Sequence, residues 1–271
     1  MYANASLTEL NQCSNERTIM LLRQNSELRK DGIWNWTIPA WKVRLDDGKL
    51  FKTCPNAGIC AQFCYALNGT YLFSNVKAAH KANLDYVLNQ PDAFEADMIH
   101  ELQMVKFRPK KNRRSQDKVD RLLAEGPTGW LEDWLLNGGA AVRIHDAGDF
   151  FAQWYLDAWI RIAEATPDVL FYAYTKEVQM FIDSAPRIPE NFRYLFSTGG
   201  LQDHLIQDRR HADVFPDDAM ADGYDSQSET DLLAIFGKSE RVGIPANNIK
   251  HFKKKMAGRR FSELTKPRPT S

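Results

Sequence analysis

The chain has 271 residues with 35 basic and 35 acidic side chains, so its formal net charge is zero. A hydrophobic share of 44% with 11% aromatic residues excludes a disordered chain, and the balanced charge removes any global drive toward nucleic acid or membranes. The N-terminal segment is polar, and no apolar run approaches the roughly 18 residues of a membrane span. We therefore expect a cytoplasmic protein without a secretion signal.

Periodicity predicts the elements of the first half of the chain. They are a short amphipathic helix over 17–28, strands over 33–39 and 41–45, a turn at 46–48 with a returning arm at 50–51, helices over 72–88 and 93–105, and an exposed loop or frayed helix end over 106–121.

From residue 140 onward strands and helices alternate. The expected strands are 140–145, 169–174, 192–197 and 240–245, and the expected helices are 153–165 and 178–184. Such alternation is typical of a parallel α/β sheet or a (β/α) barrel. We predict a single α/β domain over 1–250, as a partial or irregular (β/α) barrel, with a peripheral basic tail over 251–271.

Three of the four cysteines, Cys54, Cys60 and Cys64, fall within eleven residues in a C-x5-C-x3-C spacing. Three thiolates on one tight loop suit a [4Fe–4S] cluster whose fourth iron lacks a cysteine. An open iron is what S-adenosylmethionine (SAM) chelates before its reductive cleavage. The sequence thus predicts a metal-binding loop over 54–64 in a reducing compartment and a fold of radical-SAM-like type, although the usual radical-SAM spacing is C-x3-C-x2-C.

Two other interpretations of the cysteines stay open. A structural zinc ion needs four ligands, which Cys13 or His80 would complete, but the spacing does not give two C-x2-4-C pairs. The three cysteines are otherwise a buried trio without a ligand.

Polar side chains follow three of the predicted strands at their ends: His145, Asp146, Asp149, Lys176 and Ser197. Ligands of parallel α/β folds bind at the carboxyl ends of strands, so we expect these residues to converge on one rim. There an aspartate would hold the SAM amino group or a ribose hydroxyl, and the lysine would neutralise a carboxylate or phosphate. Singly, Asp149 is equally a helix cap, His145 a core histidine and Lys176 a surface residue.

A basic run lies between the two halves of the chain: Lys106, Arg108, Lys110, Lys111, Arg113 and Arg114. A solvated loop is the ordinary interpretation of such a run, and nucleic-acid contact through 106–114 is the more specific one.

Several stretches resemble the gene-product-88 family of bacteriophage proteins: Thr53-Cys54-Pro55 through Cys64-Tyr65-Ala66, 68–71, 143–150 and 171–176. The resemblance covers roughly 21–200, and it implies a phage origin and action in the cytoplasm of a bacterial host. It implies no particular activity. Related proteins often carry further cysteines near the C-terminus, whereas this chain has none after Cys64, so we expect no second cluster. The Cys64-Tyr65-Ala66 ending is also similar to radical-SAM-like phage proteins.

The leading hypothesis is an iron–sulfur enzyme of radical-SAM type. A reductant such as flavodoxin or ferredoxin would supply the electron, and the adenosyl radical would take a hydrogen atom from an unknown substrate. The alternative is a non-catalytic module, stabilised by zinc or an iron–sulfur cluster, that binds host protein or nucleic acid. A metal-independent hydrolase using His145 and Asp149 ranks last, because no nucleophile motif accompanies them.

Overall fold

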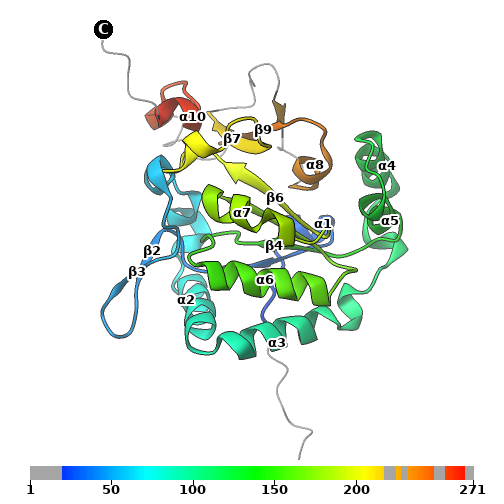
Figure 1. The fold of residues 1–271 in the computed structure, drawn as a ribbon, viewed down its shortest axis with the longest axis horizontal. Helices are drawn as coiled ribbons and strands as arrows, with labels where there is room; N and C mark the ends of the chain where they lie inside the picture. The colour runs from blue at the N-terminus through cyan, green and yellow to red at the C-terminus, as the bar shows by residue number, and fades with distance from the viewer. Residues whose placement is uncertain (1–19, 217–223, 227–230, 247–253, 266–271) are drawn as a thin grey trace, which may run out of the picture.

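The computed structural model describes residues 20–216, 224–226, 231–246 and 254–265. Within these ranges one sheet has seven strands in the order β1-β4-β5-β6-β7-β9-β8, and every neighbouring pair runs parallel. Helices lie on both faces of it (Figure 1). The predicted α/β class is therefore confirmed. β1 and β8 stand at the two ends of the strand order, and closure into a barrel is not shown.

The strands of the large sheet are β1 Ile33–Trp36, β4 Ala141–Ile144, β5 Leu170–Thr175, β6 Phe192–Ser197, β7 His211–Phe215, β8 Asp225–Ser226 and β9 Arg241–Pro245. A separate antiparallel hairpin is formed by β2 Lys42–Arg44 and β3 Leu50–Lys52. The expected strands are all present at about their predicted positions, and the sequence patterns did not predict β7 or β8.

The α-helices within the described residues include α1 Ser26–Lys30, α2 Ser74–Asn89, α3 Pro91–Leu102, α4 Gln116–Ala124, α5 Trp130–Leu136, α6 Gln153–Ala165, α7 Val178–Ser184, α8 Asp231–Phe236 and α10 Phe261–Leu264. The predictions of α2, α3, α6 and α7 are confirmed. The segment 106–121 is not only a loop, because α4 begins inside it.

The prediction of a helix over 17–28 is wrong for residues 20–25, and 17–19 lie outside the described residues. Arg23 instead pairs with Asn35 in an isolated antiparallel bridge. The helix begins only at Ser26, because the Asn25 side chain accepts the Leu28 N–H at 2.8 Å and so caps its first turn.

The larger apolar core fills the space between the sheet and α2, α3, α6 and α7, where Trp36, Phe94 and Trp159 are fully buried. A second cluster covers the opposite face of the sheet near the amino ends of its strands, where Ile33 and Ala141 join residues of α5 and α8. Neighbouring side chains along a strand alternate between the two faces.

The described part of the C-terminal tail packs onto the protein, although we expected it to be peripheral. Met256 and Phe261 are buried, and Ser262 Oγ donates to the buried Asp213 carboxylate of β7 at 2.5 Å. Thr198 Oγ1 donates to the same carboxylate at 2.6 Å. The start of α10 is thereby fixed beside the carboxyl end of β6.

In the portion of the chain that the structure describes, no helix combines the length and the apolarity needed to cross a membrane.

Candidate functional site

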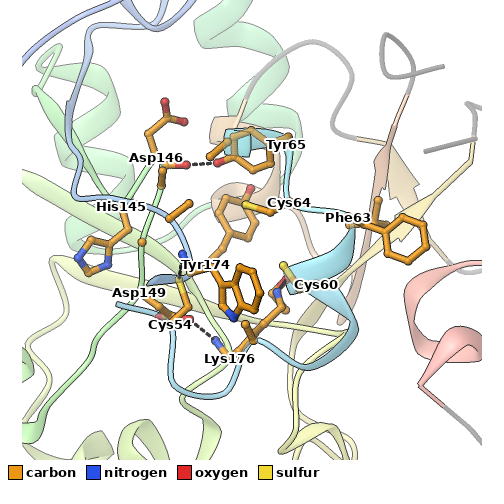
Figure 2. A pocket seen from close by; sticks show the side chains of 18 of the residues that line it. Cys54, Cys60, Phe63, Cys64, Tyr65, His145, Asp146, Asp149, Tyr174 and Lys176 are labelled. Atoms are coloured by element: carbon orange, nitrogen blue, oxygen red, sulfur yellow. Dashed lines mark hydrogen bonds between the residues drawn. The ribbon is translucent and has the colours of Figure 1, made fainter. Parts of the chain in front are cut away.

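A cavity of about 430 Å³ lies at the carboxyl edge of the sheet, a volume in the range of small-molecule sites. Cys54, Cys60 and Cys64 line it together with strand-end residues (Figure 2). The strand-end residues are His145, Asp146, Asp149, Tyr174, Lys176, Ser197, Val214, Ile244 and Pro245. The structure thus brings all eight of the residues singled out by the sequence to one cavity.

The hairpin fixes the first cysteine. The Trp41 carbonyl accepts the Thr53 and Cys54 N–H groups at 3.0 and 3.2 Å, and the Trp41 N–H donates to Cys54 Sγ at 3.3 Å. Trp41 has a φ of +57°, a strained conformation for a residue with a Cβ. These three hydrogen bonds hold that conformation and with it the position of the Cys54 thiol.

The rest of the cysteine loop is docked on the segment after β6. The Cys60 N–H donates to the Gly199 carbonyl at 3.0 Å, and the Leu201 N–H donates to the Asn56 carbonyl at 3.0 Å. Gly58 allows this close approach, because a Cβ there would lie 2.6 Å from the Gly199 oxygen. These contacts join the cysteine loop to the segment that follows β6.

Glu177 ties the loop to β5 from the other side. Its carboxylate accepts the backbone N–H of Asn56 at 3.1 Å and the side-chain amide of Asn56 at 2.6 Å. Burial, and then the charge of Asp149, raise the pKa of Glu177 to about 7. The Glu177 carboxylate near the cavity thus positions the cysteine loop.

The three thiols are free and partly buried. Burial, and then Asp149, raise the pKa of Cys54 well above its usual value, while burial and then Cys60 raise that of Cys64 to about 11. The Cys54 and Cys64 thiols are therefore favoured in their neutral form. Among the described residues, no three His, Cys, Asp or Glu side chains gather closely enough to hold a single metal ion. Three thiols on one wall are nevertheless the donor set of a cluster with an open iron.

Of the two further zinc ligands considered from the sequence, the structure describes His80 and not Cys13. His80 lies beside Tyr71, with 6.0 Å between ring centres, and Cys13 lies outside the described residues.

The Asp149 carboxylate links the segment after β4 to the carboxyl end of β5. It accepts the Phe150 N–H at 2.9 Å, the Thr175 hydroxyl at 2.7 Å and the Lys176 N–H at 3.0 Å. Burial raises its pKa, and these three donors counteract that effect. Although Asp149 lines the cavity, its oxygens are already used to position Lys176.

Lys176 extends a charged group toward Cys60 and Ser197. Its ammonium donates to Ser197 Oγ at 2.7 Å. Burial acts to lower the pKa of Lys176, but Cys60 and Asp149 nearby outweigh that effect and raise it. The cavity therefore holds a fixed positive charge, with a hydroxyl beside it, close to the cysteines.

A second polar group, centred on Arg143, lies on the cavity wall. Arg143 pairs with Asp231 at 2.8 Å and with Asp146 at 3.4 Å, both through Nη1. Tyr71 donates to Asp146 at 2.5 Å, and Tyr172 donates to Asp231 at 2.8 Å. The sequence suggested Asp146 alone, because Asp231 comes from a short helix 88 positions away from Arg143.

His145 turns its ring away from the cysteines (Figure 2). Its Nε2 lies 2.9 Å from the Tyr155 hydroxyl, and its ring packs 4.6 Å from that of Phe150. Burial lowers its pKa to about 3, so the imidazole is neutral. The structure places this ring against Tyr155 and Phe150 in the apolar core.

Part of the basic segment 106–114 is turned inward. Arg113 donates to the carbonyls of Gly138 and Arg108 at 2.8 and 2.7 Å. Arg114 is buried with its guanidinium 4.4 Å from the centre of the Trp134 ring. These two arginines make contacts within the fold, and nucleic-acid contact through 106–114 stays a prediction.

Comparisons with known proteins connect the chain to phages. The sequence model of a family described as Gene product 88 matches residues 14–266. The Gene 88 protein of Mycobacterium phage L5 is 28% identical over 138 residues, which are 49% of this chain and 46% of that protein. The chain thus spans about half the length of this curated relative. No solved structure matches.

Replacing His145 with Asn tests the buried neutral imidazole. The unfolded histidine titrates near 6.5 and the folded one near 3, so its contribution to stability is complete above 6.5 and is lost as the pH falls. Between about pH 7.5 and about pH 5 the wild type should lose about 2 kcal/mol more than the variant. Urea unfolding at the two pH values measures this. Equal losses would contradict a buried neutral ring.

Replacing Gly58 with Ala tests the docking of the cysteine loop. Gly58 and Gly69 both have positive φ, +48° and +58°, but a Cβ at Gly69 meets nothing within 4 Å. Each substitution costs about 1 kcal/mol in backbone strain. Gly58→Ala should cost about 2 kcal/mol more in urea unfolding, because it displaces the loop, and should speed the reaction of the thiols with a thiol reagent. Identical behaviour of Gly58→Ala and Gly69→Ala would disprove tight docking.

Proposed function

The chain belongs to the Gene product 88 family, and from that premise and the geometry of the cavity we propose that it is an iron–sulfur protein with radical-SAM-like activity. Cys54, Cys60 and Cys64 would hold a [4Fe–4S] cluster, and SAM would occupy the rest of the cavity. The observation that carries this proposal is the convergence of three free thiols on one cavity at the carboxyl edge of a parallel sheet.

The order of the strands supports a radical-SAM-like partial barrel. β1, β4, β5, β6, β7 and β9 are neighbours in the sheet in the order in which they occur in the chain. This sequential winding is that of (β/α) barrels, whereas doubly wound sheets reverse direction at a switch point. The cavity is also at the end of the strands where barrel enzymes bind their ligands.

The chemistry of the cysteine wall supports a cluster with one open iron. Three cysteines come from a single loop, and among the described residues no histidine or carboxylate joins them as a tight fourth ligand. Cys54, Cys60 and Cys64 would hold the cluster, which would supply the one-electron chemistry that cleaves a carbon–sulfur bond of SAM.

The protein's own residues would orient the ligand. Lys176 offers a buried ammonium, and Ser197 accepts a hydrogen bond from it while presenting its hydroxyl to the cavity. These two groups suit a carboxylate. Asp146, held by Arg143 and Tyr71, offers a carboxylate fixed before any ligand arrives, which suits an amino group or a hydroxyl.

Anaerobic reconstitution tests the proposal. The protein should absorb near ~400 nm and should cleave SAM when dithionite is the reductant. Cys54→Ala, Cys60→Ala and Cys64→Ala should each lose both properties, because each removes one thiolate ligand. Cys13→Ala is the matched control and should keep both.

The metal content of the protein also gives the result that would contradict the proposal. A protein that binds zinc stoichiometrically, takes up no iron and leaves SAM intact would refute the proposal and favour a structural metal site.

A further inference from the structure

The β2–β3 hairpin projects from the side of the molecule (Figure 1). One of its faces carries basic side chains. Val43 and Phe51 pack against the main core, which leaves Lys42, Arg44, Leu50 and Lys52 on the outward side. None of these three basic side chains has a carboxylate partner among the residues that the structure describes, because Asp46 pairs with Lys81 and Asp47 with Lys49.

The pairing of the two strands places like charges opposite each other on this face, which lowers the stability of the folded hairpin. Lys42 lies directly opposite Lys52 in the antiparallel ladder. Like charges at such positions destabilise a strand pair, and a Glu at either position would stabilise it. Beside them, Leu50 is 55% exposed. A surface that combines an exposed apolar side chain with basic side chains around it is suited to binding an acidic protein.

Trp41 connects this face to the cysteine cavity. The Lys42 ammonium lies 3.9 Å from the centre of the Trp41 ring, and Trp41 itself lines the cavity. The backbone N–H of Trp41 donates to Cys54 Sγ at 3.3 Å. Trp41 keeps its strained φ at this position between the hairpin and Cys54. One residue therefore separates the outer basic surface from a thiol of the candidate cluster.

We propose that the outward face of the β2–β3 hairpin is the docking surface for an acidic one-electron donor protein, an inference that rests on the proposed function. In the electron transfer that this docking would serve, the reduced donor would lose one electron and be oxidised, and the cluster on the three cysteines would gain that electron. The hairpin brings the donor to the side of the cavity where Cys54 and Trp41 lie.

A protein partner fits this surface better than nucleic acid does. The basic side chains are few and they surround an exposed Leu50, whereas phosphate backbones are bound by more extended arrays of Lys and Arg. Trp41 and Cys54, which flank the hairpin in the chain, line the cavity, so a donor that binds the hairpin is brought to the side where the Cys54 thiol lies.

The test uses the full chain and a bacterial flavodoxin as the acidic probe. The dissociation constant of the flavodoxin complex is measured at low and high salt for the wild type, Lys52→Glu and Lys42→Glu/Lys52→Glu. We expect the double variant to bind about tenfold more weakly at low salt, with the single variant between. Lys110→Glu/Lys111→Glu carries the same charge change on another surface and should bind as the wild type does.

Lys52→Glu separates docking from folding. It places opposite charges across the ladder, so its melting temperature should equal or exceed that of the wild type while its binding weakens. Wild-type binding by all the hairpin variants would overturn the proposal. So would equal weakening by the control pair, or hairpin-dependent binding of a DNA duplex without binding of flavodoxin.

The reconstituted protein separates this proposal from the proposed function. With dithionite, the hairpin variants should show wild-type reduction of the cluster, and with flavodoxin and its reductase their reduction should be slower. A wild type that forms no cluster refutes the proposed function, while the salt-dependent binding of the protein without metal still decides whether the hairpin docks an acidic protein.

Discussion

The site depends on the docking of the cysteine loop against the segment that follows β6. Two backbone hydrogen bonds, from Cys60 to Gly199 and from Leu201 to Asn56, join the two segments. Gly58 has no side chain at the point of closest approach, and the Glu177 carboxylate holds Asn56 on the opposite side. Without these contacts the thiols would not border the strand ends, and the cavity would have no outer wall.

Polar groups in the cavity are held by partners within the protein before any ligand binds. Lys176 bonds to Ser197, and Arg143 bonds to Asp231 and Asp146. In a cavity of low dielectric, such fixed partners avoid the cost of unpaired buried charge and keep the groups oriented. The result is a positive group on one side and a net negative group on another, separated by apolar and thiol-bearing walls. A zwitterionic ligand is complementary to that arrangement.

Strong apolar patterns made much of the fold predictable. β4 and β5 are almost wholly buried, β6 is buried at its carboxyl half, and Pro91 begins α3. β7 was missed because Asp213 interrupts its apolar pattern. That carboxylate is tolerated in the core because it has hydrogen-bond donors, among them Thr198 and Ser262, which is remote in sequence.

The cysteines and strand-end residues were found from spacing and from the rule that parallel strands present their carboxyl ends together. The orientation of individual side chains could not be predicted from these patterns. His145 would face the cavity if strand alternation continued, but β4 ends at Ile144 and a φ of +67° at His145 turns its ring into the core. The pairing of Arg143 with Asp231 depends on how α8 packs, which local sequence patterns do not encode.

The family assignment supplies an origin and no chemistry, so the cavity must be tested directly. The most direct measurement is the iron and acid-labile sulfide content of the full chain purified without oxygen. A cluster on Cys54, Cys60 and Cys64 predicts about four iron and about four sulfide per chain. One equivalent of zinc with no sulfide would contradict the central claim.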